Sequence, residues 1–327
     1  MKGKFWLVIL LCLVLFVADV LLGSLDFRWS ELLVDGSLAQ RIVFDYRLPK
    51  ALVAVLVGVA LPVSGVLMQT VFRNPLAGPY ILGVSAGASL GVALFLLGSP
   101  LIGIGLASDL GVALSAWLGA SVVLVIVLAV SVRLKDIMAV LILGMMLSSA
   151  AAALVDLLQY FSSENALKGF VMWAMGSLTS SSSEQIWIMT VCVILGVGAA
   201  VASIKVLDVL LLGENYARTM GVNLTRARLV IFAATSLLAG GVTAFCGPIA
   251  FVGIAVPHVA RMVFRTASHR RLIAASALIG VAVMLFCDIV AGMPFSDTVL
   301  PINTVTALFG IPIVILVVVR SRRNKIM

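Results

Sequence analysis

Residues 110–132 read LGVALSAWLGASVVLVIVLAVSV, an apolar run that contains no charged side chain. A helix needs about 20 predominantly apolar residues to cross the roughly 30 Å hydrocarbon core of a bilayer, and this run is long enough. The rest of the chain has a similar composition: of 327 residues, 62% are hydrophobic and 11% are charged. Soluble domains are about 25% charged because they need a water-facing surface. The sequence therefore predicts an all-α polytopic membrane protein.

Further stretches of this kind lie on both sides of the first one. Ten membrane-spanning helices are predicted, at residues 5–22, 51–71, 80–97, 110–132, 137–158, 186–204, 229–246, 249–264, 272–291 and 302–319. The first follows Lys2 and Lys4, as in a secretory signal peptide, but its 18 residues exceed the usual apolar region of about 7–15. We therefore expect it to be retained, so that residues 1–327 form a single transmembrane domain.

The basic residues are distributed unevenly between the two sides of this arrangement. If the N-terminus is cytoplasmic, 17 of the 22 Lys and Arg residues fall in cytoplasmic segments. The five on the outer side are Arg28, Arg41, Arg47, Lys50 and Lys168. Cytoplasmic loops of membrane proteins carry an excess of Lys and Arg. The distribution therefore predicts ten spans with both termini in the cytoplasm.

The third and eighth predicted spans begin unusually. They follow Gly78-Pro79 and Gly247-Pro248, and the eighth has only about a dozen apolar residues before Arg261, or about 18 Å of helix. Short, Gly/Pro-interrupted segments at matching places in two halves indicate an inverted repeat around a transport path. A simple helix start at each Gly-Pro explains the same pattern, so both interpretations stay open here.

The third span also carries small residues at helical spacing. Gly83, Gly87 and Gly91 are four residues apart and therefore share one helix face. Small faces let helices approach closely in lipid, where packing drives association. We expect this span to be buried inside the bundle.

Ionisable residues inside the predicted spans are scarce. Asp19, Asp156 and Asp288 fall near the outer ends of their spans, where we expect water to reach them, and His258 falls near an inner end. A charge near the bilayer centre costs about 2.5–3.5 kcal/mol and usually marks an ion or proton pathway. The absence of a central row of charges argues against a self-powered pump.

Catalytic motifs are also absent from the sequence. It contains no H-E-x-x-H, no G-x-S-x-G and no G-x-x-x-x-G-K-[ST] phosphate loop, which would indicate metalloprotease, hydrolase or nucleotide chemistry. We therefore expect a chain that is not an enzyme and holds no cofactor.

Metal and nucleic-acid binding are not indicated either. The four cysteines, which are Cys12, Cys192, Cys246 and Cys287, lie in or beside apolar stretches without a C-x-x-C pair, as small buried hydrophobes do. The net charge of +8 is scattered between apolar segments, whereas a nucleic-acid site needs a concentrated basic face.

The longest predicted cytoplasmic loop, residues 205–228, reads KVLDVLLLGENYARTMGVNLTRAR. Asp208 suits a helix N-cap and Gly221 a helix C-terminus. The loop predicts one or two short amphipathic helices outside the bilayer. Such a helix either caps the bundle at the interface or docks a soluble partner, and the compact segment between Gly213 and Gly221 favours docking.

Several motifs, in order along nearly the whole chain, resemble permeases of the FecCD-type family, which serve iron-siderophore, haem and cobalamin ABC importers. These motifs are RLPK (residues 47–50), QTVFRNPLAGPYILGVSAG (69–87), LGENYARTMGV (212–222), GPIAFVGIAVPHVAR (247–261) and LPINTVTALFGIP (300–312). The resemblance implies a type II ABC importer permease fold, with ten transmembrane helices per subunit and an inverted repeat of helices 2–5 and 7–10.

The resemblance also implies roles for individual residues. Coupling to an ATPase would fall to Gly213, Glu214, Ala217, Arg218, Gly221 and Val222. A periplasmic binding protein would dock at Arg47 and Lys50. The translocation path and its gate would include Asn74, Leu76, Ser148 and Ser149. One departure concerns Gly292, which follows Asp288-Ile-Val-Ala where some members carry a basic residue, and Arg28 or Arg41 is the candidate substitute.

The implied function is import of a large metal chelate, such as a ferric siderophore or haem, or of cobalamin, across a bacterial inner membrane. The implied partners are a second permease copy or a close relative, two ATPase subunits that hold ATP and Mg²⁺, a periplasmic solute-binding protein and membrane lipid. The alternative from another class is a secondary transporter driven by an ion gradient.

Overall fold

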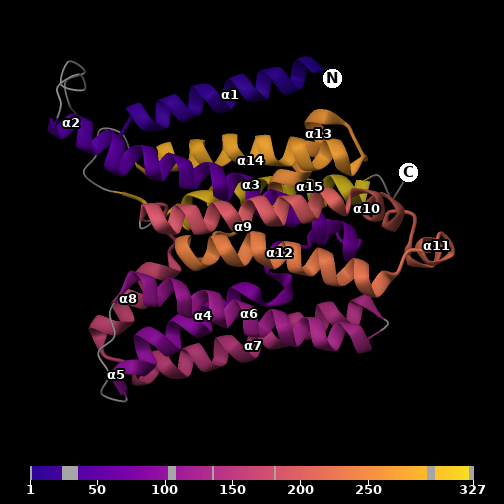
Figure 1. Cartoon of the computed structure of the whole chain (residues 1–327), viewed down its shortest axis with the longest axis horizontal. Helices are drawn as coiled ribbons and strands as arrows, with labels where there is room; N and C mark the ends of the chain where they lie inside the picture. Colours follow the sequence, from indigo (N-terminus) through magenta and orange to yellow (C-terminus); the bar gives the residue numbers. More distant parts are fainter. Residues whose placement is uncertain are drawn as a thin grey trace.

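A computed structural model describes residues 2–23, 36–101, 108–134, 136–179, 182–292 and 299–323. All regular structure in these ranges is helical. The helices lie mostly side by side along the longest axis of the molecule (Figure 1). The predicted all-α fold is confirmed.

The helices differ widely in length. The long ones are α1 (Lys2–Leu21), α3 (Leu48–Val71), α6 (Asp109–Arg133), α7 (Ile137–Phe161), α9 (Ser183–Ala202), α12 (Leu224–Cys246), α14 (His269–Ala291) and α15 (Ile302–Arg323). The short ones are α2 (Leu38–Arg41), α4 (Val84–Ala93), α5 (Ser99–Leu101), α8 (Glu164–Ala174), α10 (Ile204–Leu210), α11 (Glu214–Thr219) and α13 (Val252–Phe264). A π-helical segment (Ile42–Arg47) leads into α3, a 3₁₀ turn (Pro79–Leu82) precedes α4, and a second π-helical segment (Leu94–Gly98) follows it.

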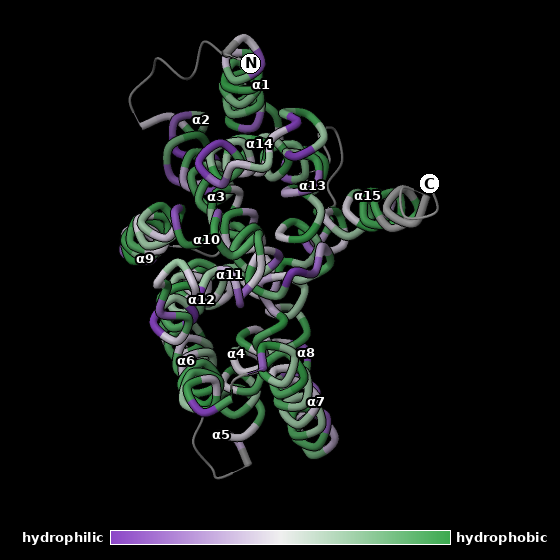
Figure 2. Tube along the Cα trace, turned by 90° about the vertical axis from the view of Figure 1, so that its right-hand side faces the viewer, coloured by the Kyte–Doolittle hydropathy of each residue, from purple (hydrophilic) through white to green (hydrophobic). Residues whose placement is uncertain are grey.

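Seven helices within the described ranges are long and apolar enough to cross a membrane, and three more apolar helices are shorter. The three are Val84–Gly98, Val252–Phe264 and Ile302–Val317. Each of the ten predicted apolar stretches overlaps one of these helices. The perimeter of the bundle is largely hydrophobic when viewed along its length (Figure 2), as the surface of a protein in lipid must be.

The bundle has two ends, which we name after residues at the two ends of α3. The Lys50 end contains the beginning of α3 and the last turns of α1 and α14, where Lys50 pairs with Asp288. The Arg73 end contains the loop after α3, α10, α11 and the beginning of α14. In Figure 1 the Arg73 end is on the right, where α11 projects beyond the long helices.

Helix α3 lies at the centre of the bundle and crosses α13 and α14 through glycines. A Cβ atom added to Gly58 would lie 2.7 Å from the carbonyl oxygen of Gly280 in α14. A Cβ atom added to Gly65 would overlap the carbonyl oxygen of Gly253 in α13. These backbones therefore approach more closely than any side chain allows, which is how small residues stabilise helix pairs in lipid.

The predicted burial of α4 is confirmed. Gly87 and Gly91 face α6, where Cβ atoms in their place would overlap the backbone of Gly119 and Ser115. Gly83 differs from these two glycines, because it precedes α4 as its N-cap and adopts a left-handed backbone with φ of 78°. Helix α4 is thus enclosed between α6 and α7.

The chain between α12 and α13 is irregular although it lies inside the bundle. Gly247 and Phe251 have φ of 71° and 66°. The Tyr80 hydroxyl donates to the carbonyl of Ile249 at 3.1 Å, and the amide of Ala250 donates to Asn303 Oδ1 at 3.0 Å. Irregular backbone at membrane depth survives only when its polar groups find partners in this way. As a consequence α13 begins well inside the bundle.

Candidate functional site

A charged cluster occupies the Lys50 end. Lys50 Nζ lies 2.9 Å from Asp288 Oδ1, and the Asp288 side chain is 2% exposed. The carboxyl group of Asp19, from α1, lies beside that of Asp288. Arg47 donates to the carbonyl of Leu21 at 2.7 Å and so caps the C-terminus of α1, where a cation is favourable. The cluster joins α1, α3 and α14.

This geometry corrects one expectation and qualifies another. Asp19 and Asp288 are buried, so the expectation that water reaches them is wrong, whereas Asp156 on α7 is exposed. Arg47 and Lys50, the predicted docking residues, both contact other helices of their own chain.

The structure also shows the surroundings of Gly292, where some members of the family carry a basic residue. Lys50 Nζ lies 3.8 Å from the position that a Cβ on Gly292 would take, so a basic group does stand beside Asp288. Of the suggested substitutes, Arg28 lies outside the described residues and Arg41 is exposed at the end of α2.

The predicted coupling segment forms α11 at the Arg73 end. Gly213, with φ of 112°, begins it, and Gly221, with φ of 80°, ends it. The amide of Val222 donates to the carbonyl of Ala217 at 3.0 Å, and Ala217 is fully buried. Asp208, predicted as an N-cap, instead lies within α10, so that prediction is wrong.

One side of α11 is anchored to the bundle and the other side is exposed. Glu214 pairs with Arg228 of α12 at 2.7 Å, and the Arg228 side chain is 7% exposed. Tyr216, Arg218 and Met220 are exposed. The sequence did not distinguish Glu214 from Arg218, because the partner of Glu214 lies in the next helix.

A hydrogen-bonded chain links α10 to α14 and α3. Asp208 Oδ1 accepts from the Nδ1–H of His269 at 2.6 Å and from its backbone N–H at 3.0 Å. His269 Nε2 lies 2.8 Å from the Thr70 hydroxyl. Sequence reasoning missed this hydrogen-bonded chain, although His269 is one of only two histidines in the sequence and begins α14.

The predicted gate loop is held against α13. Asn74 Oδ1 accepts from the amide of Leu76 at 2.9 Å and closes a tight turn. His258 Nε2–H donates to the carbonyl of Pro75 at 2.6 Å, so this histidine, predicted near an inner end, fixes the gate loop. Leu76 remains exposed.

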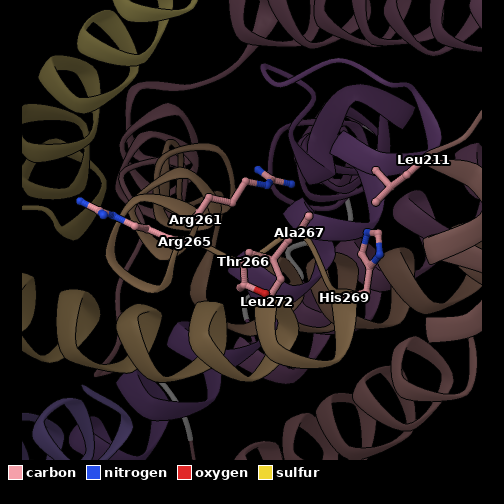
Figure 3. A pocket seen from close by; sticks show the side chains of 7 residues that line it. All are labelled: Leu211, Arg261, Arg265, Thr266, Ala267, His269 and Leu272. Atoms are coloured by element: carbon pink, nitrogen blue, oxygen red, sulfur yellow. The ribbon is translucent and has the colours of Figure 1, made fainter. Parts of the chain in front are cut away.

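Two neighbouring cavities open at the Arg73 end beside α10. The first, of about 370 Å³, is shown in Figure 3 and is lined by Leu211, Arg261, Arg265, Thr266, Ala267, His269 and Leu272. The second, of about 320 Å³, is lined by Gln69, Thr70, Arg73, Pro75, Leu211, His258 and Arg261. Arg261 and Leu211 line both cavities.

A further cavity of about 400 Å³ lies between α4 and α7. Its lining is Tyr80, Ser85, Ala86, Ser89, Ser148, Ala152, Val155, Asp156 and Phe170. Ser148, a predicted path residue, belongs to it, whereas Ser149 is exposed outside this lining and bonds to Met145 of its own helix. Ser85 and Ser89, which the sequence did not single out, also line this cavity.

Within the described ranges, no group of three or more His, Cys, Asp or Glu residues could hold a metal ion. Polar contacts in the three cavities come instead from hydroxyl, amide, imidazole and guanidinium groups, with the single carboxylate of Asp156.

The fold and its motifs match known transport proteins. The vitamin B12 import system permease protein BtuC of Escherichia coli O9:H4 (strain HS) is 35% identical over 281 residues, 86% of this chain and 84% of that protein. A solved structure of a metal-chelate type ABC transporter in an inward-facing conformation has 33% identity and a TM-score of 0.86, covering 98% of this chain and all of that one.

A more distant structure, PsaBC from Streptococcus pneumoniae in complex with Fab, shares the fold alone, with 14% identity and a TM-score of 0.55 over 85% of this chain and 92% of that one. The model of the FecCD transport family matches residues 7–320. This chain therefore belongs to the FecCD transport family.

Proposed function

We propose that this chain is the multi-pass permease subunit of an ABC importer for a chelated metal or cobalamin in a bacterial inner membrane. The observation that carries the proposal is α11, a short helix that projects beyond the long apolar helices (Figure 1). Its exposed Tyr216, Arg218 and Met220 form a surface suited to a soluble partner, while Glu214 and Ala217 anchor it. A helix that is anchored on one side and exposed on the other can transmit a partner's movement.

The proposed topology has ten spans with both termini in the cytoplasm, so that the Arg73 end is cytoplasmic and the Lys50 end is outer. The three shorter apolar helices bring the seven long ones to this number. Arg218, Arg226, Arg228, Arg261 and Arg265 all belong to the Arg73 end, as the excess of basic residues on the cytoplasmic side requires.

The proposed inverted repeat relates α3, α4, α6 and α7 to α12, α13, α14 and α15. Contacts between helices support it. Helix α4 packs on α6 and α7, and α13 packs on α14 and α15 in the same way. Helix α3 packs on α14, and α12 packs on α6, so the first helix of each repeat contacts the third helix of the other.

The transport cycle needs no catalysis by this chain. Two ATPase subunits, which hold ATP and Mg²⁺, bind at the Arg73 end, and a periplasmic binding protein delivers the chelate at the Lys50 end, where Arg47 and Lys50 are its proposed contacts. A second permease copy or close relative completes the path. The cavity between α4 and α7, with Ser148, belongs to this path, and the turn at Asn74 and Leu76 narrows its cytoplasmic end.

Uptake in proteoliposomes tests the function. The permease is reconstituted with its cognate ATPase and binding protein, and uptake of cobalamin, haem and a ferric siderophore is measured with and without internal ATP. We expect ATP-dependent uptake of one of these classes. Uptake that runs on an ion gradient in liposomes without any ATPase would overturn the proposal in favour of a secondary transporter.

A further inference from the structure

Arg261 is a cation that forms no ion pair with any residue that the structure describes. It lies in the last turn of α13, partly buried, and its Nη1 donates to Gln69 Oε1 at 2.5 Å. Gln69 is neutral and in turn donates to the carbonyl of Ile254 at 3.1 Å. Ion pairs join Lys50 to Asp288, Arg228 to Glu214 and His269 to Asp208, and Arg261 belongs to none of them.

A partly buried guanidinium of this kind is costly unless an anion compensates it. The C-terminal ends of α3 and α13 lend some negative potential, yet a guanidinium has five N–H donors and the structure uses one. The unused donors are not among the buried polar atoms without partners. They therefore reach the two cavities that Arg261 lines.

The surroundings of Arg261 add positive charge rather than neutralise it. Arg73 and His258 line the smaller cavity, and Arg265 and His269 line the larger one. Among the described residues, no carboxylate lines either cavity, and the nearby Asp208 is engaged by His269. In Figure 3 the Arg261 guanidinium extends toward the side where Leu211 and His269 lie, whereas Arg265 points away from them.

The site is also held rigidly. Arg73 and Arg265 both adopt left-handed backbones, with φ of 48° and 47°. The Pro75 carbonyl is fixed by His258, and Gln69 is fixed between α13 and Arg261. A preformed site loses little conformational freedom when an anion binds.

We propose that a carboxylate side chain of the soluble ATPase subunit enters the larger cavity and pairs with Arg261, as a second docking contact beside α11. The inference rests on the proposed function. Leu211, which lines the cavity, lies two residues before Gly213, so a partner on α11 also covers the cavity mouth. Charge complementarity favours an acidic group, and a guanidinium binds a carboxylate through charge-assisted hydrogen bonds.

The position in the bundle favours a protein over a lipid headgroup. The cavity is lined by residues of α13 and α14 and by Leu211, which directly follows α10, and its neighbour is lined by residues of α3 and α13. The apolar windows of α3 and α14 are 78% and 61% buried in the chain. A cavity at the end of such central helices opens toward the cytoplasm, whereas lipid headgroups line the perimeter.

The test compares Arg261→Gln in the full-length permease in nanodiscs with the control Arg270→Gln, at an exposed arginine of the same end that lines neither cavity. Affinity for the cognate ATPase is measured by biolayer interferometry at low and high salt. We expect Arg261→Gln to weaken binding by about 30-fold or more, as for a buried charge pair, and to reduce the salt dependence. Arg270→Gln should stay within about twofold of the wild type, as for a rim charge. Arg261→Lys should restore part of the affinity.

A second variant keeps the test decisive if Arg261→Gln does not fold. Ala267 is exposed and lines the cavity, so Ala267→Glu places a competing carboxylate beside Arg261. It should weaken ATPase binding, whereas Ala267→Gln should not.

Three results would overturn the inference. The first is equal ATPase affinity of Arg261→Gln and the wild type. The second is an anionic phospholipid, seen by native mass spectrometry, that only the wild type retains while ATPase affinity is unchanged. The third is inorganic phosphate raising the Tm of the wild type alone, again at unchanged affinity. If the wild type itself binds no ATPase, the proposed function fails, which is a different outcome.

Discussion

Basic residues lie near both ends of α3, but they differ in whether an acidic side chain of the same chain pairs with them. At the Lys50 end, the ammonium group of Lys50 meets the buried carboxylate of Asp288 at 2.9 Å. At the Arg73 end, the Arg261 guanidinium donates a hydrogen bond to the neutral amide of Gln69. Lys50 is thus neutralised by a carboxylate of its own chain, whereas Arg73 and Arg261 form no ion pair with a described residue.

The difference separates two uses of charge in a membrane protein. A balanced pair ties helices together, here α3 to α14 with α1 beside them, and its removal damages the fold. An unbalanced charge at the Arg73 end contributes little to the fold, and its removal damages an interaction with another molecule. Substitutions of the two kinds of charge should therefore differ in whether they change stability or binding.

Breaking the pair at the Lys50 end should have the largest effect. Asp288→Leu leaves Lys50 without its partner in a mostly buried place, and we expect the free energy of unfolding to fall by roughly 3–5 kcal/mol. Thermal unfolding in detergent measures it. The double variant Lys50→Met/Asp288→Leu is the control, because replacing both charges with apolar groups should recover most of the loss. A double variant as unstable as the single one would contradict the assignment of a balanced pair.

Substitutions of Glu214 and Arg218 should distinguish the residue that anchors α11 from a residue on its exposed face. Glu214→Gln removes the charge partner of the buried Arg228, so we expect a loss of about 1–2 kcal/mol in stability together with impaired ATP-dependent uptake. Arg218→Gln should leave the Tm unchanged and lower only the affinity for the ATPase. Equal melting temperatures for the two variants would show that Glu214 does not anchor α11.

The chain from Asp208 through His269 to Thr70 should behave as one unit. Asp208→Asn replaces a charge-assisted hydrogen bond by a neutral one, at a cost of about 1 kcal/mol, and Thr70→Val removes the hydroxyl at the other end. Denaturation of the single and double variants gives the coupling energy. We expect the double variant to lose less than the sum of the two single losses, and strict additivity would argue that the two contacts are independent.

The smallest effect is expected at Arg47. Arg47→Gln removes the cation from the C-terminus of α1, a change of about 0.3–1 kcal/mol. The control is Arg41→Gln, in an exposed residue at the end of α2, which should not change the Tm. If Arg47→Gln instead leaves stability unchanged and weakens only binding of the periplasmic binding protein, the charge of Arg47 serves an interaction with another molecule and not the fold.

Sequence reasoning located the helices because apolar length is a local property. It also located α11, since Gly213 and Gly221 have the positive φ that their positions require. The glycine face of α4 was predicted for the same reason, because residues four apart on a helix share a side wherever that helix lies.

Partners far apart in the sequence could not be predicted in this way. Asp208 and His269 are 61 residues apart, and Gln69 and Arg261 are 192 apart. The burial of Asp288 depends on Lys50 of another helix, so its position near a span end suggested water instead. Whether a charge is balanced is a property of the assembled helices and not of any one segment.

The glycine crossings along α3 also constrain how the molecule can move. Gly58 meets Gly280 of α14, and Gly65 meets Gly253 of α13, at points seven residues or about 10 Å apart along the helix axis. Helix α13 in turn packs on α14, so α3 cannot tilt or slide against either helix without separating backbones that are in close contact. We therefore expect α3, α13 and α14 to move as one block, and the bundle to open between this block and the helices around it.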